Sequence, residues 1–372
     1  VDGSDMKGIL RLLKEASNIE GPVMVHVLTH KGAGYLPAER HPARFHGTEP
    51  FDIETGLPSK PRVKANYTDI FSTVMRKLGD RDEKVVAITA AMTDGTGLKR
   101  FHNMFPGRFF DVGIAEEHAV TFAAGLAAAG LKPIFAVYSS FLQRAYDQIL
   151  HDVCIQNLPV VFAIDRAGLV GSDGETHQGI FDISYLSAIP NMTIMAPKNK
   201  WELSDMIKYA VDFPTPIAVR YPRGEAYDGL KEYRQPISVG KSEWIYRESE
   251  IALVALGSMV KTAEKVHAAL REEGIPASLI NSRFAKPLDT QMLMEAASKH
   301  TLVVTMEENV INGGFGEHIT RFYNEQGIYV NVLNIAIPDE YVEHGNVDIL
   351  YHEVGIDADT ILKRIKEVYH PL

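Results

Sequence analysis

The chain has 372 residues, more than one ordinary core usually holds, so two or three domains are expected. Hydrophobic residues make up 45% of the sequence and charged residues 23%, the balance of an ordinary globular protein. The formal net charge of −10 argues against non-specific binding to nucleic acid or to acidic membranes, because both need a cationic surface. Any anionic substrate must therefore be held by a few local cations.

Cys154 is the only cysteine, so the chain forms no intramolecular disulfide, and we expect a reducing compartment such as the bacterial cytosol or a plastid stroma. Its surroundings, HDVCIQ, favour a small buried apolar residue over a nucleophile. No stretch approaches the roughly 20 apolar residues of a membrane span. The sequence opens at VDGSDM, without a methionine or a signal-peptide pattern, and is expected to be the later part of something longer.

The first 50 residues are expected to form a fragment of a domain. The apolar spacing of MKGILRLLKEA predicts a helix over 6–16, and GPVMVHVLTH predicts a buried strand over 21–30. One helix and one strand cannot close a layered α/β domain, so residues 1–50 are interpreted as completing a sheet begun elsewhere. The polar segment 51–66, with proline and glycine, is predicted to be a linker.

Strands and helices then alternate through two regions, 67–235 and 249–372, joined by a second linker. The predicted strands are apolar along their whole length, which is typical of parallel sheets covered on both faces. In the first region the clearest strands are KVVAITAA, RFFDVG, KPIFAVY, PVVFAID and PIAVRY, and in the second IALVALG, ASLINSRF, TLVVTMEEN and IYVNVLNIAIP. The predicted fold is α/β: two parallel-sheet, three-layer domains preceded by a fragment of a third α/β domain.

Glu116 has unusual surroundings for a charged residue. It lies at the start of a predicted helix, and its neighbours on the same face are the small apolar residues Ala119, Val120 and Ala123, with no cationic partner among them. Desolvation there should raise the pKa of a carboxyl group and let it hold or share a proton. The alternative is that the acid only complements the helix dipole, which fits Glu117 better.

Four segments, GIAEEHAV, YSSFLQRAYDQ, DRAGLVGSDGETHQG and RYPRG, together resemble the 1-deoxy-D-xylulose-5-phosphate synthases, thiamine-diphosphate enzymes of the transketolase superfamily. The IAEEH segment is shared widely among transketolase-like enzymes, whereas the DRAG segment with YPRG is more specific to the synthases. The resemblance covers essentially the whole chain. It implies a homodimer that joins pyruvate and glyceraldehyde 3-phosphate with loss of CO₂.

The resemblance also implies roles for particular residues. A glutamate at the position of Glu116 hydrogen-bonds N1′ of the cofactor's aminopyrimidine and favours the tautomer that removes a proton from the thiazolium C2. Phe141 would stack on the aminopyrimidine, while Tyr138 and Arg144 would line the substrate side. Without the resemblance, Phe141 would be core packing, and Arg144 would pair with an aspartate of its own helix, at 147 or 152.

The glycine-rich DRAG loop follows a predicted strand and suits close approach of backbone to a ligand. The resemblance implies that Arg166 and Arg223 grip the phosphate of the acceptor aldehyde, for which the planar guanidinium is suited. Asp173 and His177 would contact its hydroxyls or the reacting groups. Asp173, Glu175 and His177 alternate along the loop, which is one pattern of metal ligands. The sequence offers no further ligands beside them, so no metal site is predicted.

In the N-terminal fragment, the resemblance aligns Lys31, Tyr35 and His46 with family residues that reach the thiamine cofactor or the substrate, and it allows His46 to assist proton transfer at neutral pH. A solvated basic loop is the alternative for this segment. The last domain is implied to be mainly structural and to support dimerisation.

The sequence also departs from the family. The family holds Mg²⁺ and the cofactor's diphosphate with a GDG motif, which is absent from this chain. The chain alone is therefore expected to bind thiamine diphosphate poorly, with the Mg²⁺ ligands in an N-terminal remainder of the same enzyme. Two alternatives stay open: the β subunit of a 2-oxoacid dehydrogenase, and a non-catalytic scaffold that keeps the fold.

Overall fold

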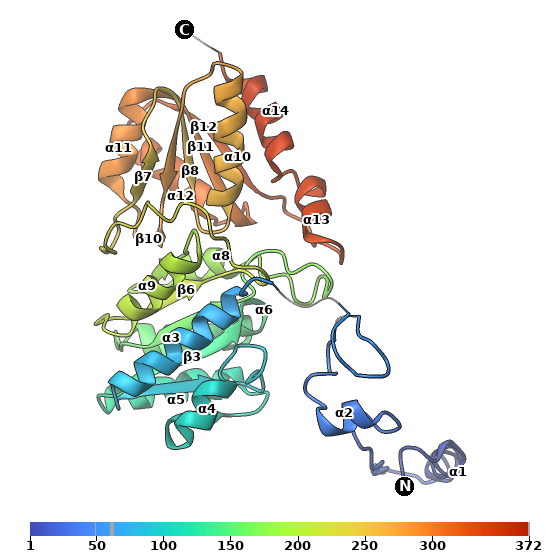
Figure 1. Cartoon of the computed structure of the whole chain (residues 1–372). Coiled ribbons are helices and arrows are strands. Elements are labelled where there is room, and N and C mark those ends of the chain that lie inside the picture. The colour runs from blue at the N-terminus through green and yellow to red at the C-terminus, as the bar shows by residue number, and fades with distance from the viewer. Residues whose placement is uncertain (49, 60–62, 371–372) are drawn as a thin grey trace. The chain divides into compact units, whose positions relative to one another are not determined.

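The computed structural model describes residues 1–48, 50–59 and 63–370. The chain divides into an N-terminal unit, Val1–Val63, and a main unit, Lys64–Leu372, which contains both sheets (Figure 1). Within the described ranges no helix is both long and apolar enough to cross a membrane.

The N-terminal unit contains the predicted helix α1 (Met6–Ala16) and the short helix α2 (Leu36–Arg40). Asp5 caps α1 by accepting a hydrogen bond from the amide of Gly8 at 3.0 Å. None of the residues of α1 is buried, and Met6 and Leu10 are 63% and 62% exposed. The apolar face of this helix is thus at most partly covered in the described part of its unit.

The predicted buried strand over 21–30 is wrong. The segment is extended but forms a single isolated bridge, between Leu28 and Asp2. Met24, in its middle, is 92% exposed. An apolar segment becomes a buried strand only when neighbouring strands and a covering layer are present, and the described residues of the unit supply neither.

The first sheet of the main unit has seven strands in the order β10-β5-β6-β4-β3-β1-β2. All neighbouring pairs are parallel except β10 with β5, which confirms the predicted parallel sheet. The strands are β1 (Val85–Thr89), β2 (Phe109–Asp111), β3 (Lys132–Tyr138), β4 (Val161–Asp165), β5 (Thr193–Met195), β6 (Ile217–Arg220) and β10 (Phe284–Lys286).

Helices cover both faces of this sheet, and its central strands are apolar along most of their length. Successive side chains of a strand point to opposite faces, so Ile134 and Ala136 of β3 join one core cluster and Phe135 and Val137 the other. On the first face lie α3 (Tyr67–Arg81) and α9 (Lys200–Ala210), and on the second α5 (Glu116–Ala128) and α8 (Asp182–Ser187). The short α4 (Lys99–Met104) and the turn η1 (Pro106–Arg108) connect β1 with β2.

The helix predicted after β3 is not continuous. It consists of α6 (Ser139–Leu142), a 3₁₀ turn η2 (Gln143–Ala145), α7 (Tyr146–Gln148) and a π-helical segment η3 (Ile149–Cys154). Tightening and then widening of the helix changes where its side chains point. Cys154, at its end, is buried as predicted, and burial raises the pKa of its thiol to about 12.

The second sheet has five strands in the order β12-β11-β8-β9-β7, parallel except for β7 with β9. Its strands are β7 (Glu243–Tyr246), β8 (Glu250–Ala255), β9 (Ala277–Asn281), β11 (His300–Val310) and β12 (Asn331–Ile337). Helices α10 (Met259–Glu272) and α14 (Ala358–Val368) pack on one face, α11 (Thr290–Lys299) and α12 (Phe315–Glu325) on the other, and α13 (Val347–Glu353) precedes α14. Strand β7 begins before residue 249, the predicted start of this domain.

The predicted strand ASLINSRF divides between the two sheets. Its first part is β9 of the second sheet, and after Arg283, which has a φ of 60°, the chain continues as β10. In β10, Phe284 pairs with Met195 and Lys286 with Ile194, so the second domain contributes an edge strand to the first sheet.

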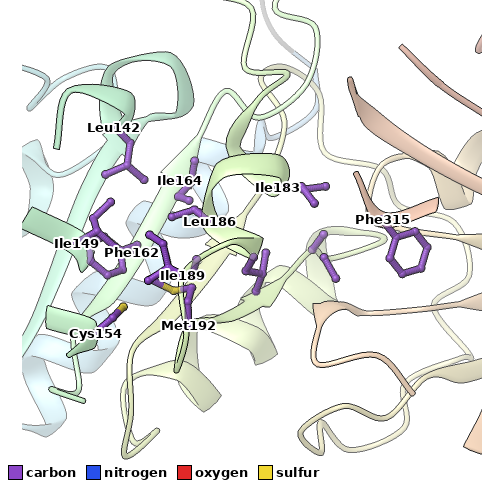
Figure 2. Packing of buried hydrophobic residues seen from close by; sticks show 14 of the residues in the cluster. Leu142, Ile149, Cys154, Phe162, Ile164, Ile183, Leu186, Ile189, Met192 and Phe315 are labelled. Carbon is purple, nitrogen blue, oxygen red and sulfur yellow. The ribbon is translucent and has the colours of Figure 1, made fainter. Parts of the chain in front are cut away.

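One hydrophobic cluster also runs through both domains. Figure 2 shows it passing from Leu142 and Phe162 of the first domain through Ile183 to Phe315 of the second. All four side chains are at most 1% exposed. The two domains of the main unit therefore share a core.

A buried ion network joins the domains as well. Lys198 and Glu202, around the start of α9, meet Glu243 of β7 and Arg283. Lys198 Nζ lies 2.7 Å from Glu243 Oε2, and Arg283 Nε lies 2.8 Å from Glu202 Oε1. Since all four are at most 3% exposed, each charge depends on the others for compensation.

Candidate active site

The carboxyl ends of neighbouring parallel strands bring the predicted site residues of the main unit together. Tyr138, at the end of β3, is in register with Asp165 at the end of β4, and Arg166 follows directly. The next strand, β6, ends at Arg220 and leads into the segment that carries Arg223. Ligands of open parallel sheets bind at this edge, so the topology places Tyr138, Arg166 and Arg223 where a ligand would be expected.

Aromatic rings form one wall of the site. Tyr138 and Phe141 stack with centroids 5.5 Å apart and planes at 24°, and the His177 ring meets Phe141 edge-on at 5.2 Å. The guanidinium carbon of Arg166 lies 3.7 Å from the centroid of the Tyr138 ring, a cation–π contact. Burial raises the pKa of Tyr138, so the phenol stays neutral and can serve as a hydrogen-bond donor.

Arg166 is positioned by contacts with residues that were not predicted from the sequence. Its Nη1 lies 3.2 Å from Asp165 Oδ1 and donates to the carbonyl of Gly95 at 2.9 Å. The other oxygen of Asp165, Oδ2, accepts from the Thr68 hydroxyl at 2.9 Å. Burial raises the pKa of Asp165, and the Arg166 charge opposes this. Asp165 is the aspartate that opens the DRAG segment, so its position beside Arg166 could have been inferred from that motif.

Gly95 shows why the turn after β1 must be small. A Cβ atom added there would lie 1.7 Å from the Tyr138 hydroxyl oxygen. A side chain at residue 95 would therefore require the Tyr138 ring to move. The turn after β1 thus lies in close contact with the tyrosine hydroxyl.

Arg223 pairs with Asp173 of the DRAG loop, with Nη1 2.5 Å from Oδ2. Both side chains are partly exposed, at 36% and 39%, so the ion pair contributes little stability and can be exchanged for a ligand oxyanion. Arg223 also lines a cleft of about 470 Å³ together with Lys261 and Lys265 of α10. The second domain therefore lies next to Arg223.

Glu116 is the first residue of α5 and is only 2% exposed, and Ala119, Val120 and Ala123 beside it are fully buried, as predicted. The cation that its own helix does not supply comes from another element. Arg144 Nη1, from the 3₁₀ turn η2, donates to Glu116 Oε2 at 3.1 Å. The helix break aims Arg144 at Glu116, which overturns the alternative of a pair within its own helix.

Three further predicted site residues, Lys31, Tyr35 and His46, belong to the N-terminal unit. Tyr35 packs against Phe45 and Phe51, at 5.6 Å and 5.8 Å, and its hydroxyl donates to the carbonyl of Ile53 at 2.7 Å. Lys31 is exposed.

His46, also in the N-terminal unit, is exposed. The roles of Lys31, Tyr35 and His46 toward a cofactor or substrate stay predictions.

The alternating loop residues do not gather into a metal site. In residues 1–48, 50–59 and 63–370, no group of three or more His, Cys, Asp or Glu side chains could hold a metal ion. Asp173 faces Arg223, and His177 Nδ1 lies 2.9 Å from the hydroxyl of Thr176.

Two family models match the main unit. The transketolase pyrimidine-binding domain matches residues 63–228, and the transketolase C-terminal domain matches residues 240–361. A solved split-gene transketolase, described as an inactive β4 tetramer, superposes with a TM-score of 0.72 at 26% identity, covering 82% of this chain and 98% of that one. Campylobacter jejuni transketolase shares the fold, with a TM-score of 0.68 at 16% identity over 82% of this chain and 47% of its own. The chain is a transketolase-like protein.

Curated relatives indicate which family of transketolase-like proteins this chain belongs to. The 1-deoxy-D-xylulose-5-phosphate synthase of Lachnoclostridium phytofermentans is 55% identical over 98% of this chain. The synthases of Caldanaerobacter subterraneus and Aquifex aeolicus are 49% and 47% identical over 99% of it. The chain belongs to the 1-deoxy-D-xylulose-5-phosphate synthase family. It spans 59%, 60% and 58% of the length of these three relatives.

Proposed function

We propose that this chain supplies the pyrimidine-binding and C-terminal parts of an enzyme that makes 1-deoxy-D-xylulose 5-phosphate from pyruvate and glyceraldehyde 3-phosphate. The observation that carries the proposal is the convergence of Tyr138, Phe141, Arg166 and His177 on one sheet edge. The identity to synthases over nearly the whole chain supports it.

The residues present fit the pyrimidine end of thiamine diphosphate. Glu116 is buried, and its Oε2 accepts a hydrogen bond from Arg144. A carboxyl group in such a desolvated position can share a proton with a weakly basic ring nitrogen. Phe141 offers an aromatic face next to Tyr138 for a flat heterocycle. When bound, thiamine diphosphate supplies a carbon that attacks carbonyl groups and an electron sink for decarboxylation.

The other residues would handle the substrates. Arg166 and Arg223 provide cations for the phosphate of the aldehyde, and Arg223 can exchange Asp173 for phosphate oxygens. Tyr138 can donate a hydrogen bond from its neutral hydroxyl. His177 stands over Phe141 with one ring nitrogen near Thr176, which leaves the other for substrate hydroxyl or carbonyl groups.

The diphosphate end and its Mg²⁺ require a further part of the enzyme. The chain has no GDG motif, and the described residues offer no metal cluster. The relatives are longer, and we place the metal-binding residues in the portion that this chain does not span. That portion could be covalently continuous or a second chain, and the split-gene transketolase, inactive as a β4 tetramer, supports inactivity of this part alone. We propose a homodimer for the complete enzyme.

Reconstitution tests the proposal. The purified chain is supplied with pyruvate, glyceraldehyde 3-phosphate, thiamine diphosphate and Mg²⁺, with and without the N-terminal portion of a synthase. Pentulose phosphate should form only in the complemented sample. A 2-oxoacid dehydrogenase β subunit would consume a 2-oxoacid without any need for the triose phosphate, and a scaffold would give no product in either sample. Either result would refute the proposed activity.

A further inference from the structure

Glu308, near the end of β11, reaches from the second domain into the base of the DRAG loop. Its Oε1 accepts a hydrogen bond from the amide of Leu169 at 2.7 Å, and its Oε2 accepts from the Ser258 hydroxyl at 2.5 Å. The side chain is 1% exposed. Because solvent barely reaches this carboxyl group, its position depends on these hydrogen bonds and on a further one with Tyr351.

The loop is closed at the point that Glu308 touches. The amide of Gly168 donates to the carbonyl of Gly179 at 2.6 Å, and the amide of Gly179 donates back at 2.8 Å. Arg166 lies just before this neck, and Asp173 and His177 lie inside the loop. A Cβ atom added at Gly168, where φ is +85°, would stand 2.2 Å from the carboxyl carbon of Glu308. The carboxyl group therefore lies directly against the neck of the loop.

The same residue also contacts the element that leads to the second arginine. Arg220, at the end of β6, donates from Nη2 to the backbone carbonyl of Glu308 at 3.1 Å. Arg220 is buried and forms two hydrogen bonds with Asp182, at 2.8 Å and 3.1 Å. Since Arg223 follows Arg220 closely, Glu308 connects the backbone segments that carry both phosphate-binding candidates.

We propose that Glu308 is a positioning residue that fixes the spacing of Arg166 and Arg223 and thereby sets the affinity of the site for the phosphate end of its substrate. This inference rests on the proposed function. It gives the second domain a direct part in substrate recognition, beyond the structural role that the family resemblance implied. Glu308 itself touches no substrate.

Glu307 provides a matched control. It is the adjacent residue, also 1% exposed, and points to a different element: its oxygens accept from the amides of Phe315 and Gly316, both at 2.8 Å, at the start of α12. Loss of its carboxylate should affect stability and leave the loop in place. For Glu308, burial raises the pKa of the carboxyl group, so glutamine is a close replacement that keeps an acceptor for Leu169.

The test measures the dissociation constant of glycerol 3-phosphate, an unreactive triose phosphate ester, for the chain combined with the N-terminal portion, by isothermal titration calorimetry. Glu308→Ala should weaken binding about tenfold or more, because a buried hydrogen bond that orders the loop is lost. Glu308→Gln and Glu307→Gln should each stay within about threefold of the unsubstituted protein. Hydrogen exchange should show faster exchange of the Leu169 amide in Glu308→Ala only.

Unchanged affinity in Glu308→Ala, or equal weakening in Glu308→Ala and Glu307→Gln, would overturn the inference, as would an unsubstituted protein that binds no phosphate ester. In active enzyme the KM for glyceraldehyde 3-phosphate should rise in Glu308→Ala with little change in that for pyruvate; a merely structural role would lower the fraction of active enzyme without separating the two. If no pentulose phosphate forms while the affinity series holds, the proposed activity fails and the positioning role stands.

Discussion

Glu116 and Arg144 form the ion pair on which the proposed chemistry depends most. A carboxylate packed among alanines is costly to bury unless it is paired, and Arg144 supplies the pair from the turn after β3. Because Arg144 is 52% exposed, solvent screens part of the interaction.

We expect Glu116→Ala to reduce the turnover of the complemented enzyme by about 10²–10⁴-fold, the range for loss of a proton-sharing group. The initial rate of pentulose phosphate formation measures this. The melting temperature should change little or rise, since the substitution removes a buried charge. Near-normal turnover would refute the role of Glu116.

Replacing Arg223 should have a selective effect. In Arg223→Ala we expect the KM for glyceraldehyde 3-phosphate to rise about 10- to 100-fold, because a charge-assisted phosphate contact is lost, while the KM for pyruvate stays nearly constant. Arg234→Ala is the control, since Arg234 forms a partly exposed pair with Asp205 away from the cluster. Equal losses for both substrates would contradict phosphate recognition.

The strand pattern placed Tyr138 at the carboxyl end of a strand, whereas Phe141, Arg166 and His177 were predicted through the family resemblance. Prediction failed where a contact depends on backbone detail. The partner of Arg144 could not be read, because it depends on a helix that tightens into a 3₁₀ turn.

At the scale of elements, the DRAG loop, β11 and α12 are linked by two consecutive buried glutamates with different partners. Glu308 holds the loop, and Glu307 binds the first amides of α12. A pattern of apolar residues ending in EEN predicts the strand but not the direction of either side chain. The same limit applies to ASLINSRF, which reads as one strand and is divided by a non-glycine residue with positive φ.

The pH dependence of stability should report on Glu307. Burial raises its pKa from an ordinary value of 4.5 to about 8, with the two amides of α12 opposing the shift. Folding thus favours the protonated form: the contribution to stability is full below pH 4.5 and is lost as the pH rises through 8. The melting temperature should fall between pH 5 and about pH 8.5 more steeply in the unsubstituted chain than in Glu307→Gln. Parallel profiles would contradict this account.

At the scale of the whole molecule, length and alternation correctly indicated two parallel α/β domains. What they did not show is how strongly these domains are joined within the main unit. The shared cluster through Ile183 and Phe315 and the network around Arg283 involve residues far apart in sequence. Apolar periodicity specifies that a face is buried, whereas the partner of that face is fixed only by the folded chain.

Arg283→Met tests the network between the domains. The substitution leaves Glu202 and Glu243 buried with Lys198 as their remaining nearby cation, so we expect a loss of about 3–5 kcal/mol in the free energy of unfolding. Urea denaturation measures it. Arg234→Ala, which breaks a more exposed pair, should cost at most about 1 kcal/mol. Similar losses in both variants would show that the buried network contributes no more to the free energy of unfolding than an exposed ion pair does.

Strand β10 has a practical consequence for anyone wishing to isolate the pyrimidine-binding half. A truncated protein ending near residue 235 would lack the segment that covers β5, exposing a row of unsatisfied amides and carbonyls in an apolar setting. Such an open edge invites self-association, and the fragment should be recovered mainly as insoluble material. Both halves are best produced, crystallised and engineered as a single piece.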